Sequence, residues 1–207
     1  MFAKLAEIPV SLWITLFVFV VLGVALLALR RTKVKWSARM LAFAALSVAL
    51  AFVLSFIRLF RFPQGGSITP ASMLPLLLFA YAFGTVPGIC AGVVYGLLQF
   101  LQGAMILNLA QVLLDYPIAF GVLGLAGLFR KKAGTLAFPA GALIACFGRF
   151  AAAVLSGVVF FAEYAGEQNP WIYSAVYNGT YMLPETLICV LVGILLVPRL
   201  VLLMKRS

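Results

Sequence analysis

The chain has 207 residues, of which 65% are hydrophobic and 10% are charged, and its formal net charge is +10. A soluble domain is about half apolar and about a quarter charged, so this composition excludes a soluble globular protein, a disordered chain and a disulfide scaffold. The sequence is instead typical of an integral membrane protein, in which a crossing helix needs about 20 apolar residues. The length leaves no room for a separate catalytic domain beside several such helices.

Apolar runs between charges, glycines and prolines predict seven helices. The first, at residues 8–29, is predicted to be a retained span, because it is too long for a signal peptide and no small-residue cleavage site follows it. The remaining helices are expected at about residues 37–59, 70–86, 88–103, 106–129, 135–162 and 171–200. The short helices 70–86 and 88–103 are separated only by Pro87. The predicted fold class is therefore all-α.

Basic residues cluster at the ends of the apolar runs and predict the topology. The clusters at residues 30–39, 130–132 and 199–206 are all cytoplasmic if the N-terminus lies outside and the C-terminus inside. Arg58 and Arg61 are exceptions at an outer helix end, where their long side chains can reach the interface. The positive charge therefore indicates membrane orientation, and we expect no nucleic-acid partner.

Two stripes of small residues recur at helical spacing. A flat stripe lets another helix approach closely, and internal packing of the bundle is the simplest explanation for both. The stripes are Gly88, Gly92 and Gly96, and Ala38, Ala42, Ala45 and Ala49.

Residues that commonly carry catalysis or hold metals are scarce. The chain contains no histidine, and Cys90, Cys146 and Cys189 lie far apart within apolar runs, as core thiols do. The sequence also lacks the glycine-rich nucleotide loop, the serine-hydrolase elbow and the zinc-protease motif. We therefore expect no catalytic residue, no cofactor and no bound metal, and any uphill transport must take its energy from a partner or an ion gradient.

Three ionisable residues, Asp115, Arg149 and Glu185, lie in the interior of predicted helices, far from the helix ends, where a charged group costs free energy. Asp115 is either a neutral carboxyl group that bonds a neighbouring helix or a carboxylate that awaits a cation. Arg149 can pair with Asp115 or with Glu185. Pairing with Asp115 would make that carboxylate structural and weaken its assignment to a binding site.

The last predicted helix carries a polar and aromatic face. Asn178, Tyr181 and Glu185 are spaced at three and four residues, and Tyr173 and Tyr177 form a second column. Aromatic rings attract cations, while carboxylate and amide groups bind the edge of a heterocycle. This pattern favours a pocket for an organic cation.

Five blocks of sequence resemble, in order, the thiamine-specific substrate-binding subunit (S component) of energy-coupling factor vitamin transporters. They read FRFPQGGSITPASMLPLLLFAYAFG, GVVYGLLQFLQG, QVLLDYPIAFGVLGLAGLF, GRFAAAVLSGVVFFAEYA and YSAVYNGTYMLPE. The resemblance implies a six-helix bundle in the cell membrane that captures thiamine at its outer face. It also implies ATP-driven uptake with one membrane coupling protein and two ATPase subunits. On this basis residues 36–207 form the S-component domain, and residues 1–35 are an extra transmembrane helix with a basic linker.

The resemblance also assigns roles to individual residues. It implies that Asp115 and Tyr116 hold the aminopyrimidine, and that residues 64–67 belong to a lid over the pocket. The expected substrate-binding residues are Gln64, Ser67, Asp115, Tyr116, Gly157, Phe161, Tyr173 and Asn178, and the residues expected to dock on the coupling protein are Ala45 and Ala49.

Two positions depart from the family pattern and leave other functions open. Ala153 stands where the family commonly has histidine, and Met105 where it often has tyrosine. Gln111, one helical turn before Asp115, is a candidate to replace the missing hydrogen-bonding group. The changes leave room for a thiamine precursor or analogue as ligand. A further alternative is a self-contained ion-coupled carrier or small intramembrane enzyme that uses Asp115, Glu185 and Arg149.

Overall fold

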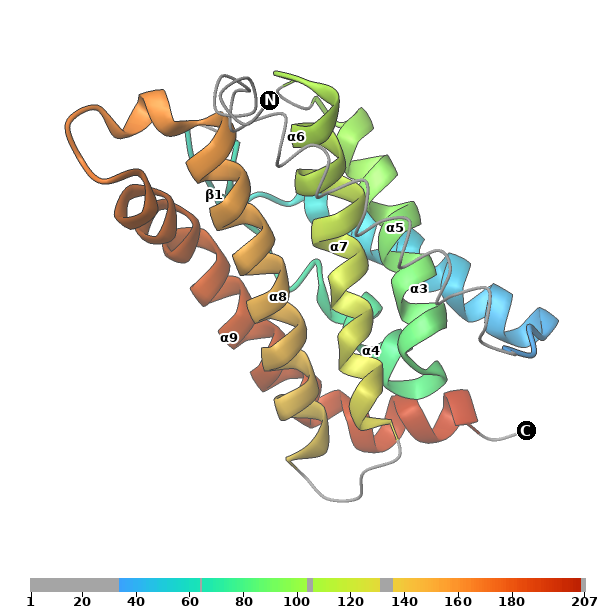
Figure 1. The fold of residues 1–207 in the computed structure, drawn as a ribbon. Coiled ribbons are helices and arrows are strands. Elements are labelled where there is room, and N and C mark those ends of the chain that lie inside the picture. The colour runs from blue at the N-terminus through green and yellow to red at the C-terminus, as the bar shows by residue number, and fades with distance from the viewer. Residues whose placement is uncertain (1–33, 64, 104–105, 131–135, 206–207) are drawn as a thin grey trace, which may run out of the picture.

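The structure, a computed structural model, describes residues 34–63, 65–103, 106–130 and 136–205. The predicted helix 8–29, Gln64 and Met105 lie outside the described residues. The described chain is predominantly helical, and its long helices run side by side in a bundle (Figure 1).

The helices from residue 37 onward lie where the sequence predicts them, with bounds shifted by a few residues. Four segments are long and apolar enough to cross a membrane: Ala38–Phe56, Leu109–Phe129, Ala137–Phe160 and Pro170–Arg199. They correspond to α3 (Ala38–Phe56), the composite segment Leu109–Phe129, α8 (Ala137–Phe160) and the first part of α9 (Pro170–Lys205). Two shorter apolar helices, α4 (Leu74–Phe83) and α5 (Thr85–Leu101), lie between α3 and the composite segment in the sequence.

The break between α4 and α5 is at Gly84 and not at Pro87 as predicted. Gly84 has φ +108°, in the left-handed region that favours glycine, and it ends α4. Pro87 lies in the first turn of α5, where its missing N–H group has no helical partner to lose.

The predicted helix 106–129 is irregular. It begins with α6 (Leu109–Leu113), passes through the π-helical turn η1 (Leu114–Ile118) and α7 (Ala119–Gly121), and ends as the 3₁₀ helix η2 (Val122–Phe129). Pro117 lies within η1 and cannot donate a backbone hydrogen bond, which accounts for the local change in winding. Such π-turns often occur at functional sites.

A small hairpin lies in the connection between α3 and α4, where the sequence predicts no helix. Strand β1 (Phe60–Arg61) pairs antiparallel with β2 (Ser67–Ile68), with Phe60 opposite Ile68. The turn uses Gly65 at φ +107°. Residues 70–73, which were predicted to be helical, instead form a turn in which Ala71 has φ +64°, a strained conformation for a residue with a Cβ atom.

Helix α4 lies at the centre of the core, and α5 packs against the composite segment. A Cβ atom at Gly92 would overlap the carbonyl of Phe120, and one at Gly96 would overlap the carbonyl of Tyr116. The glycine stripe therefore serves internal packing, as expected. The alanine stripe does not, because Ala38, Ala42, Ala45 and Ala49 are all exposed along α3. The cysteines are free thiols; Cys146 and Cys189 are buried and Cys90 is half-buried.

The contact between α5 and the composite segment predicts a large effect of one substitution. Gly92→Leu is expected to lower the free energy of unfolding by about 3 kcal/mol, because the new side chain must displace backbone. Thermal unfolding of the detergent-solubilised protein measures this change. The control is Val94→Leu, since Val94 is 50% exposed two positions away. Equal melting temperatures for the two variants would contradict the close packing of α5.

Candidate substrate-binding site

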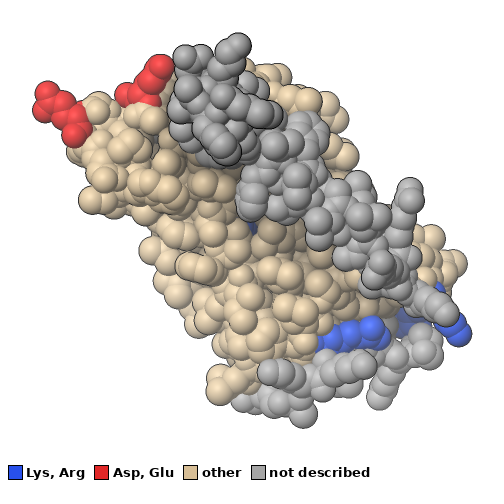
Figure 2. Space-filling view, in the orientation of Figure 1, with Lys and Arg blue, Asp and Glu red and all other residues tan. Residues whose placement is uncertain are grey.

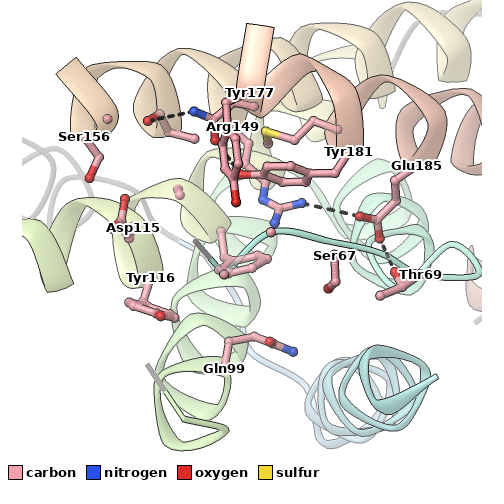
Figure 3. A pocket seen from close by; sticks show the side chains of 18 of the residues that line it. Ser67, Thr69, Gln99, Asp115, Tyr116, Arg149, Ser156, Tyr177, Tyr181 and Glu185 are labelled. Atoms are coloured by element: carbon pink, nitrogen blue, oxygen red, sulfur yellow. Dashed lines mark hydrogen bonds and ion pairs between the residues drawn. The ribbon is translucent and has the colours of Figure 1, made fainter. Parts of the chain in front are cut away.

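One end of the bundle encloses a cavity of about 330 Å³. Its walls come from α5, the segment 109–121, α8 and α9, and the hairpin and the turn after it complete the lining. Figure 3 shows the lining side chains converging from these elements. The volume is that of a small-molecule site, and the lining is rich in hydrogen-bonding and aromatic groups.

Asp115 forms one wall of the cavity from the π-turn η1. Its Oδ2 accepts a hydrogen bond from Gln111 Nε2 at 2.6 Å, and Gln111 is only 1% exposed. The Gln111 amide is itself oriented, because its Oε1 accepts from the backbone N–H of Leu107 at 3.1 Å. Gln111 therefore fixes the position of the carboxylate and leaves it acceptor capacity toward the cavity.

The ion pair in the cavity joins Arg149 to Glu185 and not to Asp115. Arg149 Nη1 lies 4.0 Å from Glu185 Oε2 (Figure 3). The guanidinium lies over the Phe120 ring, 4.3 Å from its centroid. Within the described part of the chain, no salt bridge reaches Asp115. The alternative in which Arg149 makes that carboxylate structural therefore does not hold.

Glu185 also anchors the turn that precedes α4. It accepts hydrogen bonds from the hydroxyl groups of Thr69 and Ser72, the latter at 2.6 Å. Thr69, Ser72 and Glu185 are all buried. This buried cluster, consisting of Thr69, Ser72, Arg149 and Glu185, joins the turn to both α8 and α9.

The polar face predicted for the last helix lines the cavity from α9. Asn178 Nδ2 donates to the Ser174 carbonyl at 2.9 Å, and Asn178 Oδ1 accepts from the Tyr181 hydroxyl. The rings of Tyr173 and Tyr177 stack with their centroids 6.2 Å apart. Because its own amide is held by these bonds, Asn178 presents a fixed group to the cavity.

The hairpin covers the aromatic side of α9. The Phe62 ring packs against those of Tyr177 and Tyr181, with centroids 6.0 and 5.9 Å away. A Cβ atom at Gly66 would overlap the Tyr181 ring, so the hairpin backbone lies directly on that ring. Ser67 lines the cavity from β2.

The structure brings most of the predicted binding residues to this one cavity. Those that line it are Ser67, Gln111, Asp115, Tyr116, Gly157, Phe161, Tyr173 and Asn178. Gly157 also has a packing role, because a Cβ atom there would overlap the Ser174 hydroxyl on α9. Ala45 and Ala49 lie elsewhere, on the exposed face of α3.

Sequence reasoning missed several lining residues. Tyr95 and Gln99 lie one turn apart on α5, and Gln99 Nε2 donates to the Tyr95 hydroxyl at 2.8 Å. Their four-residue spacing on an apolar helix was the available signal. Gln102, three residues after Gln99, also lines the cavity and continues this spacing, whereas Ser156 is an isolated polar residue that gave no such signal. Over the described ranges, no cluster of three His, Cys, Asp or Glu side chains forms a metal site.

Apolar helices long enough to cross a membrane surround a polar and aromatic cavity of small-molecule size. These features define the class: a membrane protein with a binding site for a small solute. The chain belongs to the thiamine transporter protein family (Thia_YuaJ), whose model matches residues 41–205. This match confirms the resemblance found in the sequence.

Individual relatives agree with this assignment. The thiamine transporter ThiT of Bacillus subtilis (strain 168) is 37% identical over 147 residues, which are 65% of this chain and 76% of the relative. ThiT of Lacticaseibacillus paracasei is 37% identical over 142 residues, 60% of this chain and 70% of the relative.

Solved structures resemble the fold. ThiT from Listeria monocytogenes has a TM-score of 0.71 and 29% identity, over 78% of this chain and 96% of that one. The S component of a bacterial ECF transporter has a TM-score of 0.56 and 24% identity, over 81% and 98% of the respective chains, and this likeness concerns the fold alone.

Proposed function

We propose that the chain is a thiamine-binding S component, which captures thiamine at the outer face of the membrane for ATP-driven uptake. The observation that carries this proposal is the Asp115 carboxylate, which faces the cavity with no basic partner among the described residues. Thiamine combines a cationic thiazolium ring with an aminopyrimidine, so it suits an acidic and aromatic site. The chain itself is not an enzyme in this proposal, and ATP hydrolysis belongs to two partner subunits.

The charges inside the cavity support a ligand with one positive charge. Asp115 and Glu185 contribute two acidic groups and Arg149 one basic group, so a bound monocation balances the interior. Arg58 and Arg61 are exposed at the rim, where water screens them. A balanced interior matters because an uncompensated charge in a membrane protein is costly.

The residues have distinct roles in this proposal. Asp115 accepts a hydrogen bond from the aminopyrimidine ring, and Gln111 orients the Asp115 carboxylate. Asn178 contributes a side-chain amide of fixed orientation to the site. Tyr116, Phe161 and Tyr173 offer aromatic faces to the two rings of the ligand. Ser67 covers the site from the hairpin, and Gly157 keeps the α8 wall free of a side chain. Gln64 is proposed to contact the ligand as well.

Orientation and partners follow from the two surfaces of the bundle. On the face in Figure 2, acidic side chains lie over the connection between α8 and α9, and basic ones lie at the opposite end. This separation supports an outer position for the cavity and a cytoplasmic C-terminus. The exposed stripe with Ala45 and Ala49 is the proposed docking surface for the membrane coupling protein. Residues 1–35 would add a transmembrane helix with an outer N-terminus.

Calorimetric titration of the purified protein with thiamine, its pyrimidine half and its thiazole half tests the proposed ligand. Tight one-to-one binding of thiamine, with weaker binding of each half, is the expected result. Ala153 favours a second candidate, a thiamine precursor or analogue, because its small side chain lines the cavity. Tighter binding of the pyrimidine half than of thiamine would indicate that ligand instead.

Uptake by proteoliposomes tests the proposed coupling. Vesicles that hold this chain alone are expected to take up no thiamine against a gradient, and vesicles that also hold the coupling protein and ATPases are expected to do so with ATP. Accumulation by the chain alone would contradict the proposal and indicate a self-contained carrier.

A further inference from the structure

A buried hydroxyl group in the cavity wall lies beside the Asp115 carboxylate but makes no hydrogen bond of normal geometry with the described residues. Ser156 lies on α8, lines the cavity and is 1% exposed. Its Oγ is the buried side-chain polar atom without a hydrogen-bond partner among the described residues. A buried hydroxyl normally finds a partner, because leaving it unpaired costs free energy.

Other hydroxyl groups around the cavity satisfy themselves within the protein. Ser55 Oγ donates to the Phe52 carbonyl at 2.6 Å, and Ser174 Oγ donates to the Val154 carbonyl at 2.9 Å. Bonds to nearby carbonyls are the usual arrangement for serine in a helix. Ser156 makes no such bond, and Figure 3 shows its side chain directed from α8 toward Asp115 on the facing element.

The neighbours of Ser156 on α8 cannot take its place. Ala153, one turn earlier, and Gly157, the next residue, also line the cavity, and neither has a side-chain donor or acceptor. Arg149, two helical turns before Ser156, is paired with Glu185. Ser156 is therefore the hydrogen-bonding side chain that α8 offers a ligand beside Asp115.

We infer that Ser156 Oγ binds the ligand directly and, together with Asp115, selects a heteroaromatic ring with an amino group next to a ring nitrogen. This inference rests on the proposed function. An ionised carboxylate only accepts hydrogen bonds, whereas a hydroxyl group also donates. Asp115 accepts a hydrogen bond from the amino group of the ring, and the Ser156 hydroxyl donates one to the adjacent ring nitrogen. Together the two side chains hydrogen-bond both polar groups on this edge of an aminopyrimidine.

Calorimetry with two ligands on the wild-type protein and two variants tests this assignment. The ligands are thiamine and its deaza analogue, in which C–H replaces the ring nitrogen next to the amino-bearing carbon. Ser156→Ala is expected to weaken thiamine binding about tenfold, as for the loss of one hydrogen bond, and to change binding of the analogue by less than about twofold. The control Ser55→Ala removes a hydroxyl group that the protein already satisfies, and it should affect both ligands equally.

The outcomes separate this inference from the proposed function. Unchanged thiamine affinity in Ser156→Ala, or equal weakening of both ligands, would overturn the role of Ser156 while leaving a thiamine-binding protein. A wild-type protein that binds no thiamine would instead overturn the proposed function. Ser156→Cys keeps the size of the side chain with a weaker donor and should give an intermediate loss for thiamine alone, which provides the test if the alanine variant does not fold.

Discussion

Asp115→Ala is expected to weaken thiamine binding by at least about 100-fold, or about 2.7 kcal/mol. The substitution removes charge-assisted hydrogen bonds and the acidic group that balances a bound cation. It also leaves the buried Gln111 amide without the acceptor that it contacts at 2.6 Å. Calorimetric titration of the purified variant measures the change.

A second variant separates charge from shape at this position. Asp115→Asn keeps the size of the side chain, and we expect it to recover little affinity, because an amide carries no charge. The matched control is Glu163→Ala, which removes an exposed acidic residue of the turn η3 (Ala162–Ala165) at the same end of the bundle. Wild-type affinity in Asp115→Ala would place the ligand site elsewhere.

Glu185→Ala is expected to lower the free energy of unfolding by about 3–5 kcal/mol, the usual cost of removing one partner of a buried pair. Arg149 would lose its counter-ion, and the hydroxyl groups of Thr69 and Ser72 would lose their acceptor. The strained turn at Ala71 would then lose two of the bonds that hold it. Thermal unfolding in detergent measures this loss.

A double-mutant cycle tests the cause of that loss. The variant Arg149→Met with Glu185→Met removes both charges and keeps much of the side-chain volume, so we expect it to be more stable than the single variant Glu185→Met, which leaves Arg149 unpaired. If the two charges act independently, the effects of the single substitutions will simply add, and the account of the buried cluster would be wrong.

The sequence predicted most of the helices because their apolar runs are long and interrupted by charge. It placed the break between the short helices at Pro87 because proline usually ends a helix, but Pro87 sits in the first turn of α5, where its missing donor costs nothing. Gly84 ends α4 instead, through a backbone conformation that spacing does not reveal. The π-turn at Pro117 was not predicted either, because a hydrophobic pattern searched with the α-helical period of 3.6 residues does not show a local change in winding.

The binding site was predictable where polar residues recur at helical spacing. Asn178, Tyr181 and Glu185 were found in this way, and all three line the cavity. Asp115 stood out as a costly residue in a membrane segment. Ser156 gave no such signal, because a lone serine in a helix costs little free energy and usually hydrogen-bonds a backbone carbonyl of its own helix. Only the absence of that bond in the folded protein distinguishes it.

The most direct test of the account is a crystal structure of the protein with thiamine. Thiamine is expected to occupy the cavity, with its aminopyrimidine edge within hydrogen-bond distance of Asp115 and Ser156. Its rings are expected to lie against Tyr116, Tyr173 or Phe161. The Arg149–Glu185 pair is expected to remain in place beneath it. Thiamine bound outside this cavity, or bound inside it with the aminopyrimidine turned away from Asp115, would contradict the account.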